Sequence, residues 1–248
     1  MTYKNFSRDI LRCDFEEGWN KWPSDSAKGV PMPSAQKACV LGDKLIDLVA
    51  PADFKFDVKL QDAIKNRRTR RKFTQGFLTL KELSFLLWST QGITDEDTAT
   101  HRAVPSASAR HPFETYLIVR RVKGLKPGVY RYLPIDHKLC IISDNKEQVE
   151  KISTSCFETN SPQIQNAAVV FIWAAVPYRT EWRAGPYAYK FIAIDAGHIC
   201  QNLYLAVEAI QAGACAVAAY EQQAVDKIIN VSGKDEFAIY LAAVGKVA

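Results

Sequence analysis

The chain has 248 residues, of which 48% are apolar and 24% charged, a balance typical of a globular protein with a sizeable core. Its net charge of +5 is mild, so charge alone favours a small anionic ligand over the groove of a nucleic acid. The longest apolar run, residues 167–176, is about half the length that a membrane-spanning helix needs. The first 14 residues show no signal-peptide core, so we expect a cytoplasmic protein with no membrane segment.

The six cysteines form no C-x-x-C pair, and neither they nor the four histidines have the spacing of a zinc site. Several of the cysteines lie in apolar runs, where a thiol behaves as a small hydrophobic side chain. We therefore expect reduced thiols and no metal centre.

Residues 1–55 predict an N-terminal arm ahead of a single domain that spans 56–248. Short helices are expected near 7–13 and 15–21, and the prolines that follow keep the chain extended or turning. Arms of this kind wrap a surface, often the surface of a neighbouring subunit.

Two helices are predicted on either side of a basic stretch. The first covers 57–66, with an apolar face. The second covers 80–91, because Thr79 and Glu82 match a capping box and Gly92 is a good terminator. This second helix is apolar nearly all round, so we expect it to be central.

The rest of the chain predicts a mixture of strands and helices. Strands are expected at 114–121, 129–132, 138–143, 167–176, 215–219 and 237–244, and helices at 146–158, 195–212 and 222–229. This order predicts the α+β class: a mainly antiparallel sheet flanked by helices, two of them in the core.

The most informative stretch is the basic loop, which we define as residues 66–73. It carries Arg67, Arg68, Arg70 and Arg71 around Thr69. Arginine presents a rigid fork of N–H donors that matches phosphate oxygens. The pattern therefore indicates a loop that holds the phosphate of a bound cofactor. A solvated basic turn and a nucleic-acid patch are the alternatives that the residues leave open.

Three further segments could approach a flat ligand. They are the loop Pro105, Ser106, Ala107, Ser108; the small apolar run that ends in Ala218 and Ala219; and Lys246 near the C-terminus. A surface loop, a buried strand and a solvated end are the respective structural alternatives. Aromatic and basic residues also gather at 182–190, where they could line a pocket or form a partly buried loop.

Several common catalytic motifs are absent, among them GxxxxGK, G-x-G-x-x-G, H-E-x-x-H and G-x-S-x-G. The histidines show no triad spacing. The sequence thus offers no evident protein nucleophile, and a cofactor that carries the reaction itself would fit that gap.

Together the motifs resemble the nitroreductase family. The segment 64–73 is similar to its flavin-phosphate motif, 80–93 to its first core helix, and 105–109 with 112–116 to the loop and strand that follow. The segments 28–33, 128–132 with 137–139, and 195–203 point to the SagB-type dehydrogenase branch. The resemblance covers about residues 25 to 247.

The resemblance implies an α+β sandwich that forms an interlocked homodimer through long helices, with FMN at the subunit interface. By the same resemblance, Arg67, Arg68, Thr69 and Arg71 contact the phosphate and ribityl chain. Pro105, Ser106, Ala107 and Ser108 approach the flavin from the partner subunit, Ala218 and Ala219 lie near the ring, and Lys246 lies near the phosphate. The flavin would accept a hydride from NAD(P)H and reduce a small organic acceptor.

One departure concerns members of the branch that oxidise azolines in peptide natural products. They carry a Lys-Tyr pair before the second core helix, where this chain reads Arg183-Ala184-Gly185. A general FMN-dependent oxidoreductase is therefore the leading hypothesis, and a peptide azoline dehydrogenase is the alternative. A nucleic-acid or anion-binding module is a third, but aromatic residues do not interleave with the basic ones.

Overall fold

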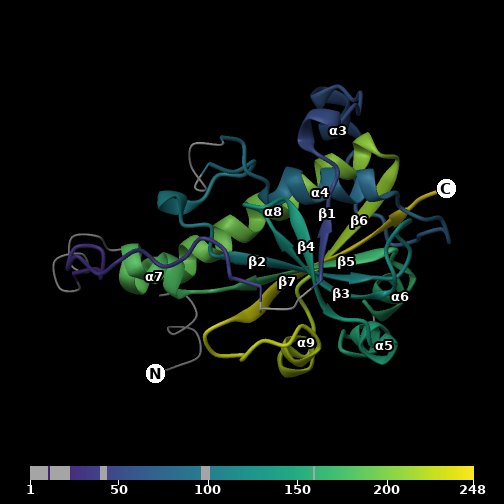
Figure 1. Cartoon of the computed structure of the whole chain (residues 1–248). Helices are drawn as coiled ribbons and strands as arrows, with labels where there is room; N and C mark the ends of the chain where they lie inside the picture. Colours follow the sequence, from purple (N-terminus) through teal and green to yellow (C-terminus); the bar gives the residue numbers. More distant parts are fainter. Residues whose placement is uncertain (1–10, 12–22, 40–43, 96–100, 159) are drawn as a thin grey trace.

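The computed structural model describes Leu11 and residues 23–39, 44–95, 101–158 and 160–248. Apart from Leu11, the two helices predicted near 7–13 and 15–21 lie outside these residues. Within them the chain forms one antiparallel sheet covered by helices on both faces (Figure 1). The predicted α+β class, with a mainly antiparallel sheet, is confirmed.

The sheet has seven strands in the order β1-β4-β3-β2-β5-β7-β6, and every neighbouring pair is antiparallel. The strands are β1 (Leu45–Asp47), β2 (Phe113–Val119), β3 (Gly128–Leu133), β4 (Lys138–Ser143), β5 (Val169–Ala175), β6 (Ala212–Val217) and β7 (Phe237–Lys246). The last strand, β7, lies between β5 and β6, so β6 forms one edge of the sheet.

Helices connect the strands and cover the sheet. The α-helices are α3 (Leu60–Asn66), α4 (Leu80–Gln91), α5 (Lys146–Thr154), α6 (Ser161–Asn166), α7 (Tyr178–Ala184), α8 (Ala188–Ala209) and α9 (Gln222–Ile228). Short 3-10 turns are η1 (Pro51–Asp53), η2 (Ala107–Ala109) and η3 (Gly185–Tyr187).

The central strand β5 shows why the molecule has two apolar cores. Its side chains alternate, so Phe171 and Trp173 face α4 and α8 while Val170 and Ile172 face α5, α6 and α9. All four are fully buried. Figure 1 shows the two helical layers on opposite sides of the sheet. The uninterrupted apolar run predicted as a buried strand is therefore confirmed as the middle of the fold.

The helix that begins at Leu80 is also confirmed, with its capping box. Thr79 Oγ1 accepts a hydrogen bond from Glu82 N at 3.2 Å, and Glu82 Oε2 accepts one from Thr79 N at 2.8 Å. The helix ends at Gln91 before Gly92, as predicted. A Cβ on Gly92 would lie 2.2 Å from the Trp88 ring, so the close approach of that indole requires glycine.

Some boundaries differ from the predictions. The helix expected at 195–212 begins earlier, at Ala188, because Ala188 and Ile192 are already buried against the core. The aromatic and basic residues at 182–190, predicted as a pocket lining or a partly buried loop, lie in the end of α7, η3 and the start of α8. The structure also adds β1 and α6, which the sequence did not predict.

The segment Ser34–Ala38 is a strap that three buried arginines hold against the sheet. Arg179 Nε donates to Ser34 O at 2.8 Å, and Arg102 Nη2 donates to Ala35 O at 2.8 Å. Arg131 Nη2 donates to Ala38 O at 2.8 Å. We call Arg102, Arg131 and Arg179 the buried arginine cluster. Thus part of the predicted arm packs on the core, and β1 from the same arm pairs with β4.

Candidate cofactor site

The basic loop runs along the outer edge of β6. Arg70 N donates to Ala214 O at 2.9 Å, and Thr69 forms a parallel bridge with Ala214. Farther along, Thr74 N donates to Lys246 O at 2.8 Å. The loop is therefore fixed to the two last strands by main-chain bonds, which leaves its side chains available for another role.

Two glycines allow this close approach. A Cβ on Gly213 would lie 2.5 Å from Arg70 Cβ, and a Cβ on Gly245 would lie 2.9 Å from Phe73 Cβ. Both distances are shorter than real side chains tolerate, so any larger residue would push the basic loop away from the sheet. The absence of a Cβ at these positions sets the position of the loop.

Tyr204 of α8 connects the basic loop with β6. Its hydroxyl accepts a hydrogen bond from Ala216 N at 2.9 Å and lies 3.3 Å from Thr69 Oγ1. The guanidinium carbon of Arg67 lies 5.5 Å from the centroid of the same ring, within the range of a cation–π contact. Tyr204 was not predicted from the sequence, because a tyrosine in a helical apolar stripe gives no functional signal.

The arginines of the basic loop have no carboxylate partner among the described residues. Arg68, Arg70 and Arg71 are exposed, and Arg67 is half-buried. Arg68 Nη1 donates only to the nearby carbonyls of Lys65 and Arg67, at 3.0 and 2.8 Å. Uncompensated guanidinium groups on a fixed backbone are the donor set that a phosphate dianion requires.

Lys246 is engaged differently. Its ammonium group donates to Glu82 Oε1 at 2.6 Å and to Ile210 O, at the end of α8, at 2.7 Å. A cation near a helix C-terminus is stabilised by the helix dipole. Here Lys246 joins β7 to α4 and α8, and its charge is balanced by Glu82.

The predicted loop from Pro105 to Ser108 lies against the first half of α8. Ser106 Oγ donates to Asp195 Oδ2 at 2.5 Å, and Ala107 N donates to Asp195 Oδ1 at 3.2 Å. Burial raises the pKa of the Asp195 carboxyl, and the two hydrogen bonds partly oppose that rise. Asp195 is thus an anchor for the loop that the sequence analysis did not single out.

The backbone of this loop is also conformationally constrained. Ser108, Ala109 and His111 have φ values of 54°, 52° and 45°, in the left-handed region that non-glycine residues rarely adopt. His111 N donates to Ser106 Oγ at 2.8 Å, which closes the loop on itself. Such strain persists only where surrounding bonds determine the conformation, and it clusters at functional sites.

Comparison with known proteins identifies the family and the fold. The model of the nitroreductase family matches residues 64–246, nearly three quarters of the chain. The chain belongs to the nitroreductase family. It is 32% identical over 190 residues to MJ1384 of Methanocaldococcus jannaschii, a protein named as a candidate nitroreductase, covering 77% of this chain and 92% of that one.

Two further similar proteins are named for trifolitoxin processing and microcin synthesis. Over 130 residues it is 28% identical to the trifolitoxin-processing protein TfxB of Rhizobium leguminosarum bv. trifolii, covering 51% of this chain and 35% of TfxB. It also resembles a chain of the Escherichia coli microcin synthetase McbBCD complex with truncated pro-MccB17 bound. That likeness has a TM-score of 0.62 at 17% identity and covers 100% of this chain and 98% of the other.

A crystal structure from Anabaena variabilis, described as a candidate nitroreductase, has a TM-score of 0.73 at 22% identity. The match covers 86% of this chain but only 43% of that one. The chain therefore spans about a third of TfxB and less than half of the Anabaena chain. These two structural likenesses concern the fold.

Within this nitroreductase-family chain, the two predicted cofactor segments lie at different places along α8. The Pro105 loop contacts Asp195, and the basic loop contacts Tyr204. These two residues are nine positions apart in α8, which corresponds to about 14 Å along the helix axis. Ala218 and Ala219 are exposed just beyond the end of β6. One chain thus brings Lys246 and β6 close to the basic loop, whereas the Pro105 loop stands apart.

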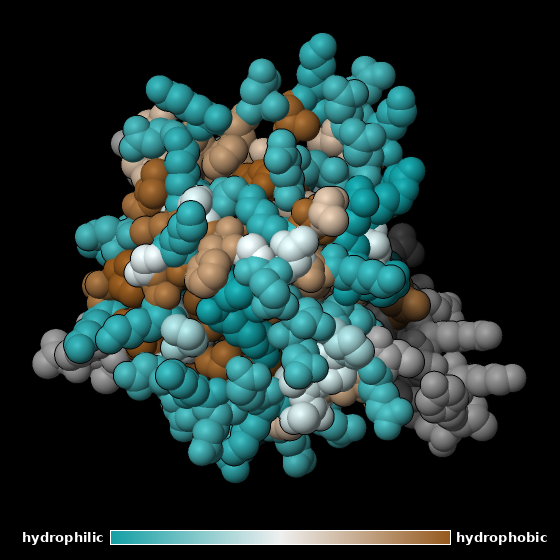
Figure 2. All heavy atoms as spheres, turned by 90° about the vertical axis from the view of Figure 1, so that its right-hand side faces the viewer, coloured by the Kyte–Doolittle hydropathy of each residue, from teal (hydrophilic) through white to brown (hydrophobic). Residues whose placement is uncertain are grey.

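The structure also places the cysteines, the potential metal ligands and the longer helices. No disulfide joins the five described cysteines. Among the described residues there is no group of three potential metal ligands, and no helix has the length and apolarity to cross a membrane. Figure 2 shows a face covered mainly by hydrophilic side chains, with apolar residues gathered toward one margin.

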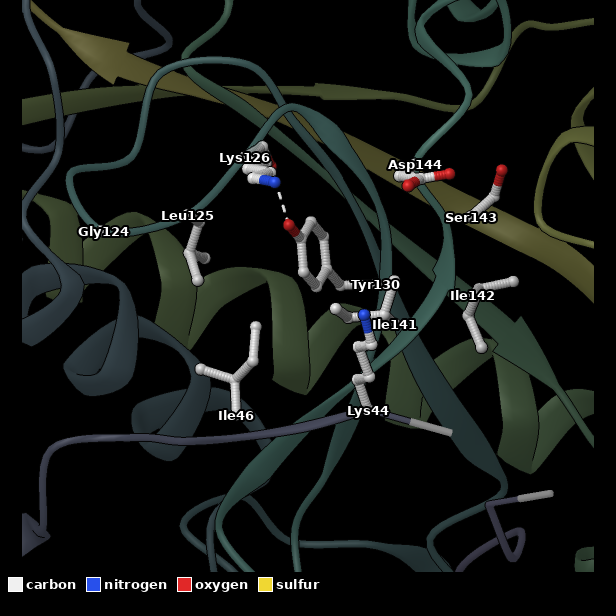
Figure 3. Close-up of a pocket in the computed structure, with 10 residues that line it drawn as sticks. All are labelled: Lys44, Ile46, Gly124, Leu125, Lys126, Tyr130, Ile141, Ile142, Ser143 and Asp144. Atoms are coloured by element: carbon white, nitrogen blue, oxygen red, sulfur yellow. Dashed lines mark hydrogen bonds between the residues drawn. The ribbon is translucent and has the colours of Figure 1, made fainter. Parts of the chain in front are cut away.

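A pocket of about 520 Å³ lies elsewhere on the molecule, between β1, the β2–β3 connection and β4 (Figure 3). The Tyr130 ring forms part of its wall, and its hydroxyl donates to Lys126 O at 2.7 Å. None of the predicted cofactor residues lines this pocket.

Proposed function

We propose that this chain is an FMN-dependent oxidoreductase that acts as a cytoplasmic homodimer and passes electrons from NAD(P)H to a small organic acceptor. The observation that carries the proposal is the basic loop in a chain of the nitroreductase family. Its guanidinium groups have no carboxylate partner in the described structure, and Gly213 and Gly245 hold its backbone against β6 and β7.

The residues present fit the phosphate end of FMN. Arg67, Arg68 and Arg71 would supply charged donors, and Thr69 would supply a hydroxyl. Lys246 is close enough to the loop backbone to add positive potential, although Glu82 offsets its charge. The bound flavin would supply hydride and electron transfer, and the chain would bind and orient it.

A homodimer is supported by apolar side chains that the monomer leaves in water. Leu60 and Ile64 on α3 are 66% and 57% exposed, and Ile194 on α8 is 46% exposed. Helix α3 packs against α8, so these residues belong to neighbouring elements. Exposed apolar side chains on adjoining helices are typical of subunit interfaces. A second copy would also supply the Pro105 loop that one chain holds away from its own basic loop.

The test is an absorbance spectrum of the purified protein, followed by FMN titration and NAD(P)H oxidation against a nitroaromatic and a quinone. We expect a yellow protein whose flavin affinity falls about tenfold or more in Arg71→Gln, since a charged hydrogen bond contributes about 1.5–3 kcal/mol. Lys151→Gln on α5, which removes an exposed charge from the opposite face, is the control. A colourless protein that stays colourless with added FMN would count against the proposal.

A second candidate is an azoline dehydrogenase that matures a peptide, favoured by the likeness to TfxB and to the microcin synthetase chain. This reaction removes two hydrogens from an azoline ring and transfers them to the flavin. The place of the branch's Lys-Tyr pair reads Arg183-Ala184-Gly185 here, so this chain would lack the tyrosine hydroxyl. Mass spectrometry of an azoline-containing peptide, incubated with the protein and oxygen, should show loss of two hydrogen atoms if this candidate is right.

A further inference from the structure

Arg110 lies at the end of the Pro105 loop with its guanidinium plane over an indole. Its Cζ lies 5.2 Å from the centroid of the Trp182 ring, and its Nε donates to Ser108 O at 2.8 Å. Among the described residues its two terminal nitrogens have no hydrogen-bond partner. Stacking on tryptophan fixes the arginine while the donor edge of its fork stays open.

Arg183 follows Trp182 at the end of α7 and is exposed. Its one described hydrogen bond, from Nη1 to Ser26 Oγ, is long at 3.4 Å. Burial lowers the pKa of Arg110, and the positive charge of Arg183 lowers it further. Both arginines are thus placed beside Trp182: Arg110 lies over its ring, and Arg183 is the next residue of α7.

The nearby described carboxylates are occupied by other groups. Asp25 accepts hydrogen bonds from Lys28 at 3.1 Å and from Tyr178 at 3.0 Å. Glu181 accepts a hydrogen bond from Tyr189. No ion pair in the described structure neutralises Arg110 or Arg183. Two like charges without a counter-ion, beside an aromatic ring, form a receptor for an anionic group.

Hydrogen bonds within the protein fix Trp182 and the Pro105 loop, the two segments that carry Arg183 and Arg110. Ser26 N donates to Trp182 O at 2.9 Å, and Trp182 Nε1 donates to Val30 O at 2.8 Å. The other side of the pair is anchored through Ser106 to the buried Asp195. Because these bonds exist before any ligand arrives, binding would require little additional ordering of the chain.

We propose that Arg110 and Arg183, beside Trp182, form a subsite for the anionic group of a substrate. This inference rests on the proposed function, in which the Pro105 loop faces the flavin of the partner subunit. The anionic group is a carboxylate on the electron acceptor or the extra phosphate that distinguishes NADPH from NADH. Both would use the same two forks of N–H donors.

Steady-state kinetics with matched pairs of substrates test the subsite. The acceptors are 4-nitrobenzoate and its neutral analogue 4-nitrobenzamide, and the donors are NADH and NADPH. In Arg110→Gln and Arg183→Gln we expect the KM for either 4-nitrobenzoate or NADPH to rise about tenfold. The KM for the matching compound without the extra charge, 4-nitrobenzamide or NADH, should change less than twofold. A rise for nitrobenzoate assigns the acceptor carboxylate, and a rise for NADPH assigns the phosphate.

Lys151→Gln is the matched control, because it removes one exposed positive charge on α5 far from α7. Thermal melting of each variant checks that folding is unchanged. Equal effects on both members of each pair, or no effect on any, would overturn the subsite.

Calorimetric binding of 4-nitrobenzoate to the protein as isolated separates this outcome from failure of the proposed function. A wild-type protein that reduces neither acceptor would refute the enzyme proposal. The subsite would still be supported if the wild type bound nitrobenzoate more tightly than nitrobenzamide and Arg183→Gln abolished that preference. If the wild type bound nitrobenzoate no more tightly than nitrobenzamide, the subsite would be rejected.

Discussion

The basic loop and the buried arginine cluster use the same side chain for opposite purposes. Three of the four arginines of the loop are exposed and none has a carboxylate partner in the described structure. The cluster residues Arg102, Arg131 and Arg179 are only 7%, 3% and 4% exposed, and they surround the buried Glu114. The comparison teaches that the surroundings, more than residue type, decide whether an arginine binds a ligand or stabilises the fold.

Desolvation explains the difference. Burial lowers the pKa of Arg102 to about 10, with the neighbouring charge of Arg179 adding to the effect. A buried guanidinium needs acceptors for its donors, and the strap carbonyls, Gln91 and Glu114 supply several of them. Arg179 Nη2 and Lys37 N both donate to Glu114 Oε1. Exposed arginines carry no such requirement, so their donors remain available.

The largest expected effect is on the cluster. Glu114→Gln removes the central negative charge and leaves three buried cations around a neutral amide. We expect a loss of about 3–5 kcal/mol in the free energy of unfolding, as for other broken buried ion pairs. Urea denaturation measures it. Glu147→Gln on α5, whose side chain is 79% exposed, should change stability by less than about 0.5 kcal/mol. Similar values for the two variants would contradict this interpretation.

A smaller effect is expected where the basic loop meets β6. Gly213→Ala places a methyl group 2.5 Å from Arg70 Cβ, so the loop must shift outward. We expect FMN affinity to fall about tenfold, with a loss of stability of about 1–3 kcal/mol from overpacking. Gly128→Ala meets a comparable clash, 2.7 Å from Ser143 O, far from the loop. That variant should lose stability but keep its flavin affinity. If Gly128→Ala lost FMN affinity as strongly as Gly213→Ala, the position of the basic loop would not explain the effect.

The smallest effect concerns pH. The pKa of Asp195 is raised by burial above the usual 3.8, so the folded state holds its proton more tightly than the unfolded state. Stability from this residue is therefore present at low pH and declines as pH rises from about 3.8 through the raised value. Asp195→Asn does not titrate, so its stability relative to the wild type should improve across that rise. Melting temperatures of both proteins, taken at a series of pH values from about 4 upward, measure the change. A constant difference would contradict it.

Local patterns made much of the fold predictable. The capping box at Thr79, the apolar run of β5 and the strands β3 and β4 are local signals, and each was confirmed. The start of α8 was not predictable, since Tyr187 to Lys190 form no apolar stripe and their helical state depends on packing of Ala188. Likewise, β1 is three residues long and exists through its pairing with β4.

The candidate site divides in the same way. Consecutive arginines identify the basic loop from sequence alone, and its roles toward FMN stay predictions. Tyr204, Asp195 and Arg110 act through contacts with residues distant in the chain, such as Thr69, Ser106 and Trp182. No spacing rule reveals such contacts. The buried arginine cluster was likewise invisible, because its members are separated by dozens of residues and meet only in the folded chain.

The position of β7 has a consequence for synthesis on the ribosome. Strand β6 and the segment bridged to it at Thr69 join the rest of the sheet only through β7, which is the last strand to emerge. Until residues 237–246 leave the exit tunnel, the edge that carries the arginines has no neighbour to pair with on its inner side. A nascent chain halted before Phe237 should therefore hold a partly assembled sheet, in which the β6 edge is not yet joined to the other strands.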